Sequence, residues 1–140
     1  MVTKQISVFI ENRKGRLGDI LDVLKENGVN ILSMSLADTA EYGLLRIISD
    51  KPQEGKTALT AAGFSSMLTD VFILKVPHTP GGLQNILRAI SDEEISVEYM
   101  YGLSAGGNEA SIVVKMSDLA KADEVFAKHK IQTLCYSDLI

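Results

Sequence analysis

Asn12-Arg13-Lys14-Gly15-Arg16-Leu17 is the stretch that decides the fold, because its pattern returns later in the chain as His78-Thr79-Pro80-Gly81-Gly82-Leu83. Each stretch places a glycine two residues before a leucine that opens an apolar stripe. The stripes are Leu17, Ile20, Leu21 and Leu24 in the first copy and Leu83, Ile86, Leu87 and Ile90 in the second. Similarity at a fixed offset indicates an internal repeat. We therefore predict two tandem α+β domains, residues 1–70 and 71–140.

Hydrophobic periodicity gives each copy the order β-α-β-β-α-β. Alternating Ile6, Val8 and Ile10 predict a strand with one face on the core, and the stripe that follows predicts a helix. In the first copy we expect strands at 5–11, 30–37, 42–48 and 64–68 and helices at 17–27 and 52–62, the second helix capped by Asp50. In the second copy we expect strands near 72–76, 95–104, 110–115 and 131–136, a helix at 82–91 and a last helix capped by Asp118. This is the ferredoxin-like arrangement, with antiparallel sheets and the helices packed on one face.

Composition excludes several classes of function. The net charge of −4 argues against a nucleic-acid partner, which requires clustered lysine and arginine. No apolar run is long enough to span a membrane, and the first residues do not resemble a signal peptide. The single cysteine, Cys135, forms no disulfide framework or metal-binding pair. We expect a cytoplasmic protein with no metal, no cofactor and no catalytic residues.

The glycine turn is the main indication of function. Glycine lets the chain turn sharply and lets its backbone approach another group closely. The first N–H groups of the helix that follows have no intrahelical acceptor, and together with the helix dipole they favour a carboxylate or phosphate. The alternative is that Gly15 and Gly81 only bend the chain and bind nothing.

These turns, together with Gly28-Val29-Asn30-Ile31 after the first helix, resemble the ACT domain family. The resemblance covers the whole chain twice and implies a free-standing tandem ACT protein. It also implies a free amino acid as ligand, bound where the glycine turn of one module meets the start of the second strand of another. The site residues that it implies are Asn12, Gly15, Arg16, Leu17, Asn30, Ile31, His78, Pro80, Gly81, Gly82, Leu83, Ser96 and Val97.

The two copies depart from the usual ACT signature in different ways. Asn12 and His78 stand where an acidic residue is usual, and Gly82 follows the main glycine of the second copy. In the second copy Ser96 also replaces the asparagine that is found at position 30 of the first. We therefore expect the two sites to differ.

A homodimer is predicted from the face of each sheet that the helices do not cover. By simple alternation this face carries Phe9, Val71, Ile73, Tyr99 and Tyr101. Exposed apolar patches of this size commonly mark interfaces.

The preferred interpretation is a non-enzymatic sensor of a free amino acid that regulates an amino-acid biosynthetic or transport protein in trans. One alternative is a small ferredoxin-like dimeric enzyme with its site between subunits, for which His78 and Arg16 would be the residues to suspect. Another is a structural regulatory subunit that binds no ligand.

Overall fold

The computed structural model describes residues 1–11, 13–38, 41–106 and 109–139. Its elements are β1 (Thr3–Glu11), α1 (Arg16–Glu26), β2 (Ile31–Asp38), β3 (Tyr42–Ser49), α2 (Pro52–Ala61), β4 (Ser65–Pro77), α3 (Gly82–Asp92), β5 (Val97–Gly106), β6 (Glu109–Met116), α4 (Leu119–Lys128), β7 (Thr133–Leu134) and the 3-10 helix η1 (Tyr136–Leu139). Contacts group them into a first unit, Lys4–Thr69, and a second unit, Asp70–Ile140 with Met1–Thr3. The predicted duplicated α+β fold is confirmed.

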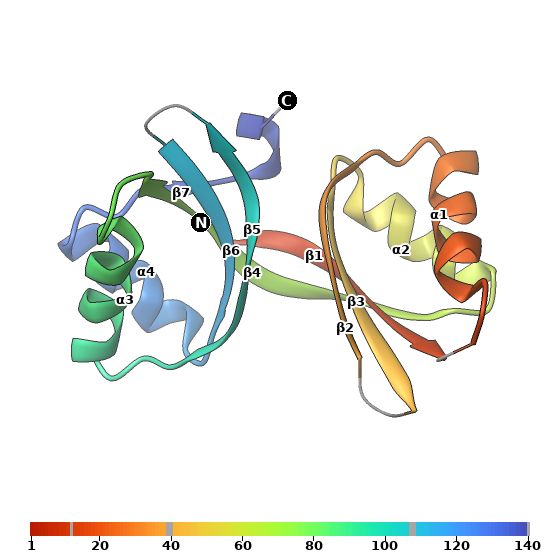
Figure 1. Cartoon of the computed structure of the whole chain (residues 1–140), viewed down its shortest axis with the longest axis horizontal. Coiled ribbons are helices and arrows are strands. Elements are labelled where there is room, and N and C mark those ends of the chain that lie inside the picture. The colour runs from red at the N-terminus through yellow and green to blue at the C-terminus, as the bar shows by residue number, and fades with distance from the viewer. Residues whose placement is uncertain (12, 39–40, 107–108, 140) are drawn as a thin grey trace. The chain divides into compact units, whose positions relative to one another are not determined.

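The first unit has the strand order β2-β3-β1-β4. Both helices lie on the same face of its sheet (Figure 1). The core consists of Ile6, Val8, Ile10, Ile20, Leu24, Val29, Leu45, Ile47, Leu59 and Phe64. The alternating residues of β1 and the stripe of α1 thus meet, as the periodicity predicted. Gly28, in the left-handed region at φ 67°, ends the first helical segment as expected.

The second unit repeats this order, because β7 pairs with β4 and the sheet continues through β6 to β5. Its core contains Phe72, Leu74, Val76, Ile86, Ile90, Ile95, Val114, Met116, Ala122, Val125 and Phe126. The rings of Phe72 and Phe126 meet edge to face, with their centres 4.9 Å apart. The Asp118 side chain accepts a hydrogen bond from the Lys121 N–H, so the predicted cap of α4 is confirmed.

Two residues that were expected on an open sheet face are buried. Val71 and Ile73 are fully buried, and so are their chain neighbours Phe72 and Leu74, which face the helices. β4 is a central strand here, and an apolar run buried on both faces does not show the alternation of a half-exposed strand. Of the predicted patch, only Phe9 is largely exposed, at 53%. Tyr99 and Tyr101 are half-buried.

Asp50 does not cap α2, because Lys51 occupies the cap position and no side chain caps this helix. Instead the Asp50 carboxylate accepts the Asn30 N–H at 2.8 Å, and the Asp50 N–H donates to the Asn30 carbonyl at 3.2 Å. The local sequence pattern predicted that the Asp50 side chain caps the helix. It instead joins the two ends of the β2–β3 hairpin.

The last predicted strand, at 131–136, is reduced to the two residues of β7, and η1 follows it. The aspartate of η1 explains the early end, since the Asp138 carboxylate accepts the Cys135 N–H at 2.9 Å and closes a turn. Among the described helices, none has the length and apolar character that a membrane crossing requires.

Candidate ligand-binding site

The first glycine turn joins the end of β1 to the start of α1. Gly15 is the N-cap residue and has the left-handed angles φ 87° and ψ −9°. The turn is closed by the Arg16 N–H, which donates to the Arg13 carbonyl at 3.3 Å, and the helical ladder starts with the Asp19 N–H on the Gly15 carbonyl. Among the described residues, the N–H groups of Leu17 and Gly18 have no backbone acceptor. They are the positive end of the α1 dipole.

The second glycine turn has the same geometry. Gly81 has φ 83° and ψ −5°, and the Gly82 N–H donates to the Thr79 carbonyl at 3.0 Å. The N–H groups that lack a backbone acceptor among the described residues are those of Leu83 and Gln84. In both turns, then, the first amide after the glycine is used by the turn itself, and the next two are left for another partner.

A cavity of about 200 Å³ adjoins the first turn. It is lined by Ile10, Glu11, Arg13, Gly15, Leu17, Gly18, Leu36 and Gly43. Four elements therefore build it: the end of β1 with the turn that follows it, the start of α1, and the facing ends of β2 and β3. Its aliphatic wall consists of Ile10, Leu17 and Leu36. The exposed Arg13 and Glu11 side chains form an ion pair of 2.7 Å beside it.

Two of the glycines that line this cavity have different surroundings. A Cβ added at Gly18 would meet no heavy atom within 4 Å, so the space above this residue is empty. A Cβ added at Gly43 would lie 2.6 Å from Ile10 Cγ2 and 3.3 Å from Leu36 Cδ1. Glycine at position 43 thus allows β1, β2 and β3 to bring their aliphatic side chains together there.

The second unit carries larger side chains at the matching positions. Gln84 takes the place of Gly18 in the helix. Ala110, which pairs with Val76, takes the place of Gly43, which pairs with Ile10. Leu83 and Gln84 line a different hollow of about 560 Å³, along the outer side of α3. The expected difference between the two turns is thus visible in the side chains around them.

The other predicted residues lie elsewhere. Arg16 is directed at Phe64, with its guanidinium carbon 4.3 Å from the ring centre, and not into the cavity. Asn30 and Ile31 line a separate hollow of about 400 Å³ at the far end of α1. Within one unit the structure therefore does not bring the glycine turn and the start of the second strand together.

In the second unit, the N–H of Ser96 is bound by the Ser117 hydroxyl at 3.0 Å. Its neighbour Val97 begins β5 and is half-buried. His78 and Pro80 are exposed in the second turn, whereas Gly82 is buried. Asn12 lies outside the described residues.

Sequence reasoning missed Gly18, Leu36 and Gly43. A signal was present for Gly43, because a glycine inside a strand often marks a close approach of neighbouring groups. Gly18 carried a weaker signal, a helix-disfavouring residue inside the first turn of a predicted helix. Among the residues that the structure describes, no group of three or more histidine, cysteine or acidic side chains is placed to hold a metal ion.

The chain was compared with protein-family models and with solved structures. A family model described as an ACT domain pair matches residues 1–140. Among solved structures, the chain is similar to protein BT0572 from Bacteroides thetaiotaomicron, with 36% identity over 96% of this chain and 92% of that chain and a TM-score of 0.91. No curated protein matches the sequence.

Two further structures share the fold at low identity. The regulatory subunit of aspartate kinase from Thermus thermophilus is 14% identical, with 91% of each chain covered and a TM-score of 0.65. The corresponding subunit from Thermus flavus is 17% identical, with 87% of this chain and 86% of that chain covered and a TM-score of 0.62.

Proposed function

The chain belongs to the ACT domain family, as a pair of ACT domains, and from this membership we propose that it is a non-enzymatic sensor of a free amino acid. The ligand binds at the first glycine turn, and the liganded form regulates an amino-acid biosynthetic or transport protein in the cytoplasm. The observation that carries this proposal is the cavity at Gly15, where an aliphatic wall meets a helix start with two N–H groups that have no backbone acceptor among the described residues.

Each part of an amino acid has a partner at this cavity. The N–H groups of Leu17 and Gly18, at the positive end of α1, bind the α-carboxylate. The Glu11 carboxylate, exposed beside the cavity, binds the α-ammonium. Ile10 and Leu36 hold an apolar side chain. A volume of about 200 Å³ gives room for roughly seven water molecules at about 30 Å³ each, which suits a short aliphatic side chain.

Signalling requires that the ligand bind one state of the protein more tightly than another. In the ACT family the glycine turn of one module faces the second strand of another. We therefore propose that Asn30 and Ile31, or Ser96 and Val97, complete the site from a neighbouring module. The ligand would then stabilise the arrangement of modules that the regulated protein recognises.

A homodimer is part of this proposal. Phe9 and Tyr42 are 53% and 56% exposed. They share the sheet face opposite the first core, because Tyr42 pairs with Glu11, whose side chain points to the same face as Phe9. Sedimentation analysis of the wild type and of Phe9→Glu tests the dimer. A wild type that stays monomeric at all concentrations would contradict the proposed homodimer.

The test of ligand binding is a thermal-shift screen of the twenty amino acids. A ligand at a hundred times its dissociation constant adds about 2.7 kcal/mol to the stability of the folded state. Gly18→Gln, which introduces the residue of the second turn, is expected to abolish the shift by filling the open space. Gly102→Ala is the matched control, because a Cβ there also meets nothing within 4 Å and lies outside the cavity. A shift that survives in Gly18→Gln would place the ligand elsewhere, and no shift with any amino acid would contradict the proposal.

A further inference from the structure

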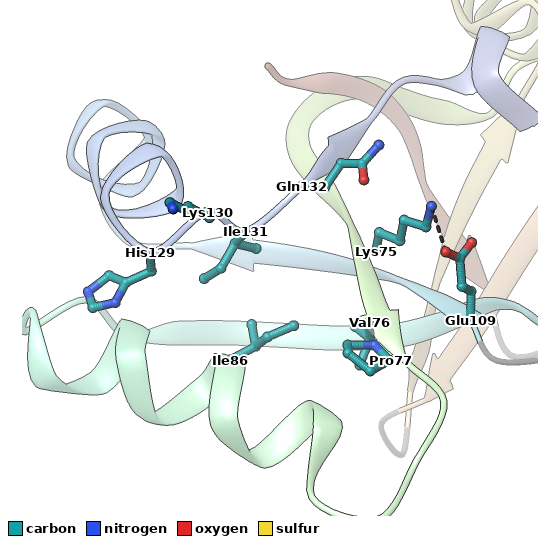
Figure 2. Close-up of a pocket in the computed structure, with 9 residues that line it drawn as sticks. All are labelled: Lys75, Val76, Pro77, Ile86, Glu109, His129, Lys130, Ile131 and Gln132. Carbon is teal, nitrogen blue, oxygen red and sulfur yellow. Dashed lines mark ion pairs between the residues drawn. The ribbon is translucent and has the colours of Figure 1, made fainter.

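The second unit contains a hollow of about 440 Å³ that includes no residue of either glycine turn. It lies between α3, the end of β4 and the segment that leads from α4 to β7 (Figure 2). In Figure 2 the side chains of Ile86 and Ile131 point toward each other across it. A smaller hollow of about 190 Å³ shares these two isoleucines and His129 with it. Together they form the α3–β7 hollow, whose lining on the helix side of the sheet is Val76, Ile86, Ala89, His129, Lys130 and Ile131.

The first unit fills the corresponding place with an aromatic ring. The counterpart of Ile131 is Phe64, because the N–H of each donates to the carbonyl five residues earlier, at the end of the preceding helix. Phe64 is 6% exposed and belongs to the core of the first unit. The Arg16 guanidinium lies over its ring, 4.3 Å from the centre. The counterpart of Arg16 is Gly82, so the second unit lacks both the ring and the cation that covers it.

Position 82 offers no replacement for the missing side chains. A Cβ added at Gly82 would overlap the carbonyl oxygen of Pro77, so the path of the backbone requires glycine there. The hollow therefore follows from the backbone at the start of α3 and from the smaller side chain at position 131.

A second difference between the units concerns the residue before Ile131. The first unit has Gly63 there, with φ 91°, and the second unit has Lys130, with φ 56°. Side chains rarely adopt this left-handed conformation. Glu94 adopts it too, at the end of α3, so the conformation alone does not indicate a function. The position of Lys130 is distinctive, because Lys130 lines the hollow and the structure records no ion pair for its ammonium among the described residues.

No carboxylate lines the helix side of the hollow among the described residues. Val76 belongs to the core under the helices, so its neighbours Lys75 and Pro77 face the other side of the sheet. Glu109 pairs with Pro77 and faces that other side as well, where its carboxylate is 2.8 Å from the Lys75 ammonium. A molecule in the hollow would therefore meet a cation but no partner for an ammonium group.

A peptide strand fits this place poorly. In the described chain β7 pairs with β4 at Ile73 and Leu74, and the Lys75 N–H then donates to the Gln132 carbonyl at 3.0 Å. Beyond that point β4 ends at Pro77, which has no N–H to offer to a further strand. These contacts favour a small molecule over a peptide that adds to the sheet.

We propose that the α3–β7 hollow binds a small aromatic carboxylic acid that carries no amino group. Its ring enters between Ile86 and Ile131, at the place that Phe64 fills in the first unit, and its carboxylate binds the Lys130 ammonium. An apolar cavity of about 150 Å³ is enough to bind benzene, so the hollow has room for a ring with a short chain. This site does not depend on the proposed function of the glycine turn, because a chain whose turn binds nothing would still contain it.

The test is a titration of the full chain with 3-phenylpropionate, followed by the methyl signals of Ile86 and Ile131. Its amide lacks the charge, propionate lacks the ring, and phenylalanine is the same acid with an added ammonium group. The acid is expected to bind about three-fold more tightly than its amide, since the ion pair with Lys130 is exposed. Propionate is expected not to move the methyl signals.

Three outcomes would overturn the proposal. Equal binding of the acid and its amide would remove the role of Lys130. Phenylalanine that moves the same methyl signals at equal or lower concentration would contradict the preference for an acid without an amino group. Methyl signals that do not move with any of these compounds would remove the site.

Two variants locate the binding. Ile131→Phe introduces the side chain of the first unit and is expected to abolish binding by filling the hollow. Lys130→Gly is expected to melt at or above the wild-type temperature, because glycine adopts the left-handed conformation without strain. It should weaken binding of the acid about three-fold and leave binding of the amide unchanged. Unchanged binding of the acid in Lys130→Gly would overturn the proposed contact, and this test remains if Ile131→Phe does not fold.

Glu94→Gly is the matched control for Lys130→Gly, because it relieves the same conformation outside the hollow. It is expected to bind the acid like the wild type. Gly18→Gln separates this site from the glycine turn of the first unit and is also expected to bind the acid normally. Binding that is lost in Gly18→Gln and retained in Ile131→Phe would assign the acid to the turn and overturn the site in the second unit.

Discussion

The Arg16 guanidinium carbon lies 4.3 Å from the centre of the Phe64 ring, over its face. This contact joins the start of α1 to the segment between α2 and β4, so it connects the two helices of the first unit through their ends. Arg16 is also 3.6 Å from the Asp19 carboxylate, and its Nε is buried without a partner among the described residues. A cation over an aromatic face and the packing of the arginine stem both stabilise this unit.

Replacing Arg16 by alanine is expected to lower the free energy of unfolding by about 1–2 kcal/mol. The loss combines the cation–π contact with the packing of the stem on Phe64. Urea denaturation measures it. Arg13→Ala is the control, because its exposed ion pair with Glu11 contributes only about 0–1 kcal/mol. Equal effects of the two variants would show that the stack contributes nothing beyond a surface arginine.

Two alanine substitutions at the first turn should act in opposite directions. Gly18 lies in α1, and a Cβ there meets nothing, so Gly18→Ala is expected to stabilise the fold by about 0.5–1 kcal/mol. Gly15 has φ 87°, and alanine in the left-handed region costs roughly 1–2 kcal/mol. Thermal unfolding of both variants measures the difference.

Gly18→Ala also distinguishes an effect on stability from an effect on ligand binding. The added methyl group of Gly18→Ala enters the cavity at the turn, so this stabilised variant is expected to bind its amino acid more weakly. A variant that is both more stable and binds as tightly as the wild type would show that the ligand does not occupy the space above Gly18.

The parts of this fold that sequence predicted are those that neighbouring residues determine. The helix predicted at 82–91 is observed at Gly82–Asp92, because its apolar spacing and the glycine before it act locally. The same holds for the strand predicted at 42–48, observed at Tyr42–Ser49. The order of elements followed from these segments and from the repeat.

The parts that were missed depend on residues that meet only after folding. Asp50 looked like a helix cap, but the N–H of Asn30, twenty residues earlier, takes its carboxylate. The cavity at the first turn needs Gly18 from a helix and Gly43 from a strand, and neither position shows by itself that it faces the other. Local pattern assigns a residue to an element, whereas the site depends on how elements meet.

The Asp50 contact has a counterpart in the second unit, and both should be measurable. The Asn30 N–H donates to Asp50 at 2.8 Å, and the Ser96 N–H donates to the Ser117 hydroxyl at 3.0 Å. Asp50→Ala and Ser117→Ala are each expected to cost about 1 kcal/mol of stability, the Asp50 variant more because its acceptor is charged. Chemical denaturation measures both.

Asp50→Asn is the control for this contact, since the amide oxygen still accepts the Asn30 N–H while the charge is lost. It should retain part of the stability that Asp50→Ala loses. If the alanine and asparagine variants are equally stable, the hydrogen bond between the ends of the hairpin is not what the aspartate contributes.

Glu93 supports a prediction on acid stability. Its carboxylate accepts a hydrogen bond from the Lys128 ammonium at 2.6 Å and lies 3.5 Å from His129 Nε2. These contacts, that of Lys128 foremost, hold the pKa of Glu93 below its ordinary value. A carboxyl group whose pKa is lower in the folded state stabilises the fold above its unfolded pKa of roughly 4.3. This contribution is lost as the pH falls through the lowered pKa.

Glu93→Gln should therefore unfold at a lower temperature than the wild type near pH 7, and the two curves should converge once the pH has fallen below the lowered pKa of Glu93, where both side chains are neutral. Thermal unfolding across this pH range is the measurement. The control is Glu94→Gln, an exposed neighbour for which the structure records no ion pair among the described side chains. A difference between wild type and Glu93→Gln that stays constant as the pH is lowered from 7 until the wild type unfolds in acid would mean that Glu93 acts through its shape and not through its charge.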